Sequence, residues 1–405
     1  MTRGSNPRST FCGVLIALSV LFAPPLRAVD RPGDSGRTVA IGDVHGDFDS
    51  FVSILQRTGL VDDRLKWTGG TATLVQTGDL MDRGPKVRPV LDLLMALEDQ
   101  AAQSGGRLIV LLGNHEVMNL MRDVRDVAPA AYAAFATDSS AARQQRGYRE
   151  YVAFMAERKT ALGGTLPVLT QEAWLQSHPP GFLEYADAFD TDGVYGRWLR
   201  SRKVVITIGD TAFLHAGIDP SVAPSSLDAI NRRVRDEIRR FDEYRRYLID
   251  RRIILPSFTL SEIIDGVVAE VKARNAADER DRQVLSEMLR IGTWDSIRPD
   301  GPLWFRGFAT WSPTEGASLI RKLQEKYNVA HWIVGHTISS SLHITPRFGS
   351  QVFLIDTGMT TSHFPGERSS ALEIRDGRFT AIAGNEQTVL LAPQTASPAA
   401  HARLP

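Results

Sequence analysis

The sequence predicts an α/β fold, because apolar strands that end in polar, glycine-containing turns alternate with helical patterns early in the chain. The strand and the turn of three such units are residues 38–41 with 42–46, 72–76 with 78–84, and 107–112 with 113–116. Open α/β sheets bind ligands at the carboxyl ends of their strands. The three turns place oxygen and imidazole donors at that edge, namely Asp43, His45, Asp79, Asn114 and His115.

Two stretches between these units, residues 48–58 and 86–103, have the apolar spacing of amphipathic helices. Each helix would pack back on the sheet and leave its N-terminal amide groups facing the ligand edge. Because helix N-termini favour anions, these turns also suit phosphate.

Composition sets limits on the class of protein. The chain has 405 residues and is 43% hydrophobic, which is enough for the core of one large domain or two. Its 47 basic and 47 acidic residues give a formal net charge of zero. This balance argues against non-specific binding to nucleic acids or to membrane surfaces, so we expect no nucleic-acid partner.

The N-terminus has the pattern of a secretory signal peptide at residues 1–28. Arg3 and Arg8 precede an apolar stretch that is too short to span a bilayer, and cleavage is expected after Ala28. An uncleaved anchor or an ordinary helix is the alternative, since Leu26 matches the small-residue rule poorly. We expect a periplasmic or secreted protein with no stable membrane insertion after cleavage. Cleavage would remove Cys12, the only cysteine, and would leave 44 basic and 47 acidic residues. A mature chain without cysteine excludes a cysteine-dependent phosphatase.

After the third unit, the sequence predicts helical insertions at about residues 122–200 and 221–290. The first is rich in alanine and then in aromatic residues, and the second holds charged helices with a solvated face. We hypothesise that the first insertion walls or caps the site; the alternative is a helical layer that packs elsewhere. His178, next to Pro179, is expected to be a loop residue and not a ligand.

Two later strands also end in histidine. A hairpin over residues 204–214 leads into His215, and the strand 331–334 leads into His336. Another strand precedes Asp356, and a final hairpin pairs 371–374 with 378–382. A single strand-end histidine is more often structural, so these two gain weight only from the other donors.

Six side chains of metal-binding type therefore stand at strand ends: Asp43, His45, Asp79, Asn114, His215 and His336. Six donors exceed the needs of one ion that also binds water and substrate. They fit two divalent ions about 3.5–4 Å apart that share a carboxylate, for which Asp79 is the natural bridge. Manganese is our first expectation for these ions, with iron and zinc as alternatives.

Five motifs follow one another in an order that resembles the calcineurin-like metallophosphoesterases. They are Gly42-Asp-Val-His-Gly46, Gly78-Asp-Leu-Met-Asp-Arg-Gly84, Gly113-Asn-His-Glu116, His215-Ala-Gly217 and Gly335-His-Thr337. The Asp-Arg-Gly ending of the second motif is similar to the phosphoprotein phosphatase branch. The signal pattern, Trp304-Phe-Arg-Gly307 and Asp356-Thr-Gly358 resemble the bacterial Shewanella-like phosphatases.

The resemblance implies an α/β fold in the form of a calcineurin-like β-sandwich flanked by helices, with helical insertions. The metallophosphoesterase domain would span residues 38–392, after a flexible lead-in at 29–37 and before a disordered tail at 393–405. Asp43, His45 and Asp79 would hold the first ion. The second ion would be held by Asp79 together with Asn114, His215 and His336.

The resemblance also implies catalytic roles. A metal-bound hydroxide would attack phosphorus, His115 would protonate the leaving oxygen, and Asp82 would orient His115. Arg83, Asn114 and Arg306 would bind the phosphate. Glu116 would have a supporting role through hydrogen bonds.

Three functions remain open on the sequence. The first is a phosphomonoesterase that acts on phosphoproteins, with phosphotyrosine preferred, or on small phosphate esters. The second is a secreted nucleotide or dinucleoside-polyphosphate hydrolase, which would need a groove for the base. The third is a non-catalytic, metal-bound binding module, although the chain has lost neither a ligand nor His115. Eukaryotic relatives have glycine at the position of Ala216, and alanine should be tolerated if its backbone angle is ordinary.

Overall fold

The computed structural model describes Met1 and residues 36–163, 168–273, 278–360 and 368–393. The predicted signal peptide, nearly all of the lead-in and the predicted tail after residue 393 therefore lie outside the described residues. None of the helices in the described ranges is long and apolar enough to cross a membrane.

The first sheet contains the three predicted strand–turn–helix units. Its strands are β1 (Thr38–Ile41), β2 (Thr73–Gln76), β3 (Arg107–Val110), β9 (Ser370–Arg375), β10 (Arg378–Ala383) and β11 (Glu386–Leu391), in the order β11-β10-β9-β1-β2-β3. The helices α1 (Phe48–Arg57) and α2 (Val87–Gln103) are the crossovers that make β1, β2 and β3 parallel. The C-terminal hairpin joins this sheet through β9, which runs antiparallel to β1.

The second sheet contains the two histidine-terminated strands. It has the order β4-β5-β6-β8-β7, with β4 (Val205–Ile208), β5 (Thr211–Leu214), β6 (His331–Val334), β7 (Thr345–Arg347) and β8 (Val352–Leu354). Strands β5, β6 and β8 are parallel, and the two outer strands are antiparallel to their neighbours.

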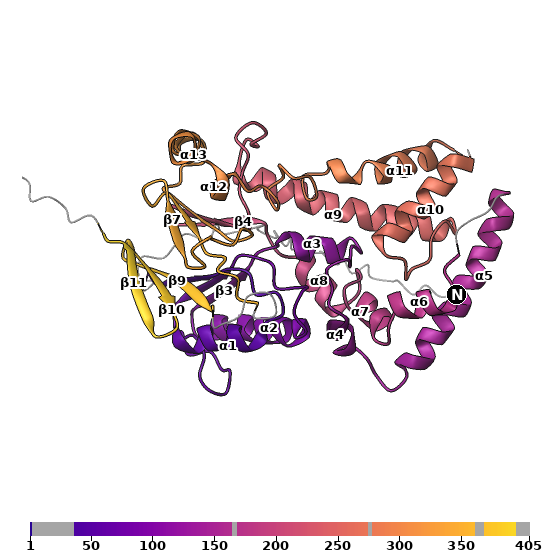
Figure 1. Ribbon diagram of the computed structural model, residues 1–405, viewed down its shortest axis with the longest axis horizontal. Helices are drawn as coiled ribbons and strands as arrows, with labels where there is room; N and C mark the ends of the chain where they lie inside the picture. Colours follow the sequence, from indigo (N-terminus) through magenta and orange to yellow (C-terminus); the bar gives the residue numbers. More distant parts are fainter. Residues whose placement is uncertain (2–35, 164–167, 274–277, 361–367, 394–405) are drawn as a thin grey trace, which may run out of the picture. The chain divides into compact units, whose positions relative to one another are not determined.

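The two sheets form the predicted sandwich, because alternate residues of each strand point to opposite faces. Ala40, Val75, Phe213, Ile333 and Phe353 belong to one buried cluster that joins the sheets. Their strand neighbours belong to a second cluster that joins the outer faces to the helices. Figure 1 shows the resulting layers, with α1 and α2 below the first sheet and the helices α12 (Gly307–Thr310) and α13 (Pro313–Tyr327) above the second.

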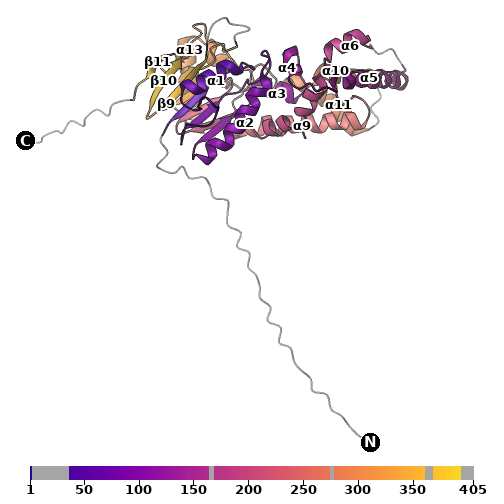
Figure 2. The ribbon, with the colours of Figure 1, turned by 90° about the horizontal axis from the view of Figure 1, so that it is seen from below.

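Both predicted insertions are helical. The first contains α4 (Pro129–Ala133), α5 (Ser140–Leu162), α6 (Gln171–Ser177), α7 (Phe182–Ala188) and α8 (Val194–Arg200), and it follows the short helix α3 (Asn114–Leu120). The second contains α9 (Leu227–Asp250), α10 (Leu260–Ala273) and α11 (Glu279–Leu289), with a 3-10 turn at Ile291–Thr293. Figures 1 and 2 both show α5, α10 and α11 on the opposite side of the domain from β9–β11.

Candidate metal centre and catalytic site

The structure brings the predicted donors together at the carboxyl ends of β1, β2, β3, β5 and β6. The tightest group surrounds His215, whose Nε2 lies 2.9 Å from Asn114 Oδ1, 3.1 Å from His336 Nδ1 and 3.3 Å from Asp79 Oδ2. All four side chains are buried. We call this group the His215 half of the site.

Backbone carbonyls determine which nitrogen of each ring faces this centre. His215 Nδ1 lies 3.1 Å from the Thr77 carbonyl, and His336 Nε2 lies 3.1 Å from the Trp304 carbonyl. A carbonyl oxygen only accepts hydrogen bonds, so these nitrogens carry the single proton of each neutral ring, and the facing nitrogens of the neutral rings are lone pairs. With both rings neutral, four acceptors converge, and this set of ligand atoms fits a divalent cation.

The other half of the site is built around His45. Its Nδ1 donates to the Met81 carbonyl at 2.8 Å, and its Nε2 lies 3.6 Å from Asp79 Oδ2 and 3.8 Å from Asp43 Oδ2. A donor also enters this group, because Arg83 Nη1 lies 2.8 Å from His45 Nε2. The same Asp79 oxygen thus faces both His45 and His215, which is the geometry that a bridging ligand needs.

Several buried carboxyl groups lie close together in the site and shift one another's pKa values. Burial raises the pKa of Asp43 well above its usual value, and the charges of Asp356 and Asp79 raise it further. Burial also raises the pKa of Asp356 to about 6. Burial acts in the same direction on Asp79, but the charges of His215 and His115 hold its pKa well below the usual range. Such a concentration of buried acids is stabilised by bound cations.

Glu116 holds the turns that carry these ligands, which is the supporting role expected from the sequence. Its two carboxylate oxygens accept backbone N–H bonds of 2.7–3.2 Å from four residues, which are Asp79, Leu80, Met81 and Gly113. Glycine is required at 113 by close approach, because a Cβ there would lie 2.2 Å from Asp79 Oδ1. Ala216 is buried but is not among the described residues with positive φ, so its backbone angle allows alanine.

Several site residues have left-handed backbone conformations that favour glycine. They are His45, Asp79, Asp82, Arg83 and His336, with φ between 47° and 67°. Non-glycine residues in this region are strained, and such strain clusters at functional sites.

His115 and Asp82 form a buried pair beside the two halves. His115 Nδ1 donates to Asp82 Oδ2 at 2.6 Å, and His115 Nε2 lies 3.8 Å from Asp79 Oδ2. Burial lowers the pKa of His115, but the charge of Asp79 and the hydrogen bond that His115 donates to Asp82 outweigh it and raise that pKa to about 9. In the absence of metal this shift favours the charged imidazole, whose Nδ1 proton is held by Asp82.

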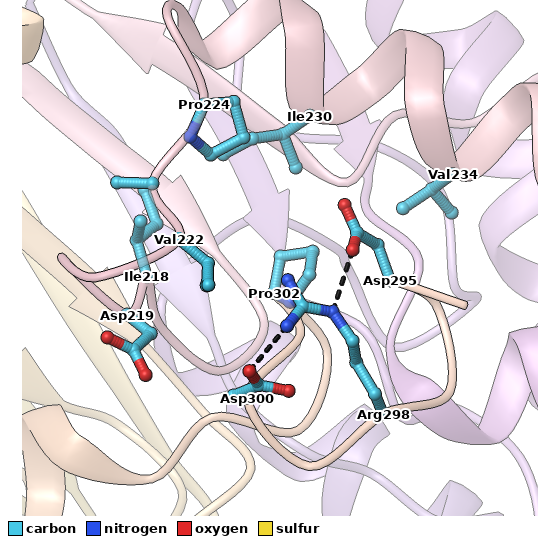
Figure 3. Close-up of a pocket in the computed structure, with 11 residues that line it drawn as sticks. Ile218, Asp219, Val222, Pro224, Ile230, Val234, Asp295, Arg298, Asp300 and Pro302 are labelled. Atoms are coloured by element: carbon cyan, nitrogen blue, oxygen red, sulfur yellow. Dashed lines mark hydrogen bonds and ion pairs between the residues drawn. The ribbon is translucent and has the colours of Figure 1, made fainter. Parts of the chain in front are cut away.

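The two predicted phosphate-binding arginines lie on different sides of the site. Arg83 Nη2 is 3.2 Å from His115 Nε2, whereas Arg306 Nη1 donates to the His336 carbonyl at 3.0 Å and to Thr337 Oγ1 at 2.9 Å. Figure 3 shows part of the loop that leads to Arg306, together with a cavity beside it. In this loop Arg298 is ion-paired with Asp295 and Asp300, so its charge is neutralised within the loop.

The sequence analysis gave no role in the site to three residues that the structure places around it. Asp356, which was expected after a strand, follows β8 and is buried near Asp43. Asn119 donates to Asp82 Oδ1 at 2.8 Å and lies four residues after His115, on the same face of α3. Tyr185 of α7 donates to Asn119 Oδ1 at 2.6 Å, and no local pattern announces this contact.

The first insertion therefore reaches the site from behind α3, through Tyr185. His178, by contrast, lies at the C-terminal end of α6, where its ring stacks on Trp174 with centroids 4.3 Å apart. As predicted, it is not part of the donor set.

Comparisons with known proteins agree with the predicted family and fold. The family model described as calcineurin-like phosphoesterase matches residues 36–236. An uncharacterized protein of Schizosaccharomyces pombe is 27% identical over 344 residues, which cover 82% of this chain and 75% of that protein. Shewanella-like protein phosphatase 2 of Arabidopsis thaliana is 30% identical over 214 residues, covering 51% of this chain and 52% of that protein. The crystal structure of a cold-active protein-tyrosine phosphatase from a psychrophilic Shewanella species shares the fold, with a TM-score of 0.54 and 22% identity over 88% of this chain and 80% of that one.

Proposed function

Because the chain belongs to the calcineurin-like metallophosphoesterases and is a metal-dependent phosphoesterase, we propose that it is a phosphomonoesterase with two divalent ions. One observation carries this proposal. The acceptor atoms around Asp79 fit metal cations, and His115, which is hydrogen-bonded to Asp82, lies beside them.

Asp79 would bridge the two ions, with Asp43 and His45 on one side and Asn114, His215 and His336 on the other. When bound, such a pair of ions activates the attacking water and neutralises phosphoryl oxygens. The Asn114 amide, Arg83 and Arg306 would position the phosphate between the two halves. Manganese is the proposed metal, with iron and zinc as alternatives.

His115 would protonate the leaving oxygen. Its Nδ1 proton is held by Asp82 at 2.6 Å, so the Nε2 proton is the one that can be transferred. The hydrogen bond from Nδ1 to Asp82 supports this role, because a carboxylate partner favours the charged form of the ring. Asp82 would keep the ring oriented during proton transfer and would stabilise its charge.

The proposed substrates are phosphoproteins, with phosphotyrosine favoured over phosphoserine and phosphothreonine. The relatives named Shewanella-like protein phosphatase support a protein substrate. The proposed preference for phosphotyrosine follows the name of a structure with the same fold, the cold-active protein-tyrosine phosphatase of the Shewanella species.

The test is hydrolysis by the protein from residue 29 onward in the presence of Mn²⁺. The panel contains phosphotyrosine, phosphoserine and phosphothreonine peptides and a dinucleoside tetraphosphate. We expect turnover of the peptides, fastest for phosphotyrosine. Turnover of the dinucleotide alone would instead support a phosphoanhydride hydrolase, and a panel without turnover would support the non-catalytic binding module.

His115→Ala is the control for this test. It removes the acid but none of the proposed ligands, so it should retain its metals and lose about 10²–10⁴-fold in turnover of esters with poor leaving groups. Full activity of this variant on such esters would exclude His115 as the acid.

A further inference from the structure

The hydrogen bonds behind the Asp82–His115 pair continue into the first helical insertion. Asn119 donates its amide protons to Asp82 Oδ1 at 2.8 Å and to the His115 carbonyl at 2.9 Å. Its amide oxygen accepts from the Tyr185 hydroxyl at 2.6 Å. These bonds connect α7, α3 and the turn after β2 in a single hydrogen-bond chain that ends at the His115 ring.

Each bond in this chain has one possible direction. Both partners of the Asn119 nitrogen are pure acceptors, so its amide oxygen must face Tyr185, and the tyrosine must donate. Asp82 is then held at both oxygens, by Asn119 at Oδ1 and by His115 at Oδ2. A carboxylate fixed at both oxygens cannot rotate without breaking a bond.

This hydrogen-bond chain is buried, so each of its bonds contributes more than it would at the surface. Asp82, Asn119 and Tyr185 are at most 2% exposed, and hydrogen bonds are stronger in such a low-dielectric interior. Asp82 also has a φ of 67°, a strained conformation that the surrounding structure must maintain.

Arg122 fixes the insertion against α3 at this point. Its backbone N–H donates to the Asn119 carbonyl at 3.0 Å, and its side chain donates to the Ala186 carbonyl at 3.1 Å and to the Phe258 carbonyl at 3.3 Å. Ala186 is the neighbour of Tyr185 on α7. The tyrosine hydroxyl therefore reaches Asn119 from a backbone that is itself anchored to the end of α3.

We propose that Tyr185 and Asn119 are positioning residues, through which the first insertion holds Asp82 and so keeps His115 Nε2 directed at the leaving oxygen. This inference rests on the proposed function, which makes His115 the general acid. It gives the first insertion an indirect role in proton transfer.

The experiment compares Tyr185→Phe with Tyr195→Phe. Tyr195 is a matched control, because it is also a buried tyrosine of the first insertion and donates to Asp92 Oδ1 at 2.5 Å, but its bond leads away from the site. The kcat of both variants is measured on phosphate esters whose leaving groups span a range of pKa. Alkyl leaving groups need the acid, whereas dinitrophenolate leaves without it.

For Tyr185→Phe we expect kcat to fall about three- to tenfold on alkyl esters, the effect of one hydrogen bond. On dinitrophenyl phosphate we expect no change. Tyr195→Phe should match the wild type on every ester. Parallel changes in the two variants would overturn the proposal, because a general loss of stability does not depend on the leaving group.

A second measurement is independent of turnover. In the chelator-treated protein, the proton between His115 Nδ1 and Asp82 should give a low-field NMR signal that His115→Ala removes. Tyr185→Phe should shift this signal and Tyr195→Phe should not; an unshifted signal in Tyr185→Phe would contradict the proposal. If His115→Ala itself showed no dependence on the leaving group, the acid role would fall, and that outcome is distinct from failure of the tyrosine chain alone.

Discussion

The two halves of the site use similar ligands but differ in their protons. Around His215 every facing atom is an acceptor, and the histidine protons point outward to the Thr77 and Trp304 carbonyls. Around His45 a donor is present, because the Arg83 guanidinium lies 2.8 Å from Nε2. With neutral histidines, a cation in the His215 half would contact only acceptor atoms. A cation in the His45 half would have to displace the hydrogen bond between Arg83 and His45 Nε2.

This difference predicts that the two proposed ions would bind with unequal affinity. In the His215 half three ligand atoms lie within 3.3 Å of His215 Nε2, while the His45 half is more open, with 3.6–3.8 Å between His45 Nε2 and its carboxylates. We therefore expect the ion at the His215 half to be retained longer during chelation. The predictions below test this difference in metal affinity and the roles of the residues that both halves use.

The largest expected effect comes from the residue that both halves use. Asp79→Asn removes the charge that faces His45 and His215, so this variant should lose both ions and all turnover. Asp43→Asn is the matched control, since Asp43 serves only the His45 half, and it should retain one ion. Elemental analysis of the two purified variants measures the difference. Two ions per chain in Asp79→Asn would refute the bridge.

Glu116→Gln tests the support that the halves share. Two buried carboxylate oxygens accept four backbone N–H groups, and an amide at this position would turn a donor toward two of them. Leaving buried donors unpaired should lower the free energy of unfolding by about 2–4 kcal/mol. Urea denaturation measures this change. Glu98→Gln, which alters a partly exposed ion pair with Arg202, should cost less than about 1 kcal/mol.

Arg83→Met separates the two functions of this arginine. Without the guanidinium, His45 Nε2 becomes a free lone pair, so affinity for the ion at the His45 half should rise. Turnover should nevertheless fall about 10–100-fold, because a charged hydrogen bond to the phosphate is lost. Calorimetric metal titration and steady-state kinetics give the two values. Arg88→Met, in a nearby exposed residue, should change neither; weaker metal binding in Arg83→Met would contradict the competition.

Much of the site was predictable because its residues lie in local motifs. His45, Asp79 and Asn114 stand immediately after strands, and a strand followed by a glycine turn is visible within a few residues. The same local logic predicted the two sheets in outline. It did not predict β11 or α13, although Ser312 and Pro313 form an ordinary helix start at which the Ser312 side chain accepts from Glu315 N.

The contacts behind the site were not predictable in this way. Tyr185 lies 66 residues from Asn119, and their hydrogen bond depends on how α7 packs beside α3. Nothing in the local pattern around Tyr185 distinguishes it from Tyr195, which uses its hydroxyl elsewhere. Local sequence therefore specified the ligands, while the long-range packing of the insertion specified the groups that hold them.

The smallest predicted effect concerns the pH dependence of stability in the chelator-treated protein, because the pKa values of the site's histidines shift in opposite directions. Burial lowers the pKa of His45 to about 3 and that of His336 to about 2, whereas His115 is raised to about 9. In the unfolded chain these histidines have an ordinary pKa of about 6.5. Below that pH the unfolded state therefore binds protons that His45 and His336 cannot bind in the folded state, and the free energy of unfolding should fall. The slope should be at most about 1.4 kcal/mol per pH unit for each histidine.

His115 should act in the opposite direction. Its proton stabilises the fold fully below pH 6.5, and this contribution is lost as pH rises from 6.5 through about 9. The contribution of these histidines to the free energy of unfolding should therefore be greatest near pH 6.5, and urea denaturation of wild type and of each histidine variant across pH isolates it from that of the buried carboxyl groups. His336→Gln should make the acid side less steep, and His115→Gln should flatten the alkaline side. If the acid side kept its slope in His336→Gln, the inward-facing nitrogen of that ring would not be the buried lone pair that distinguishes the His215 half.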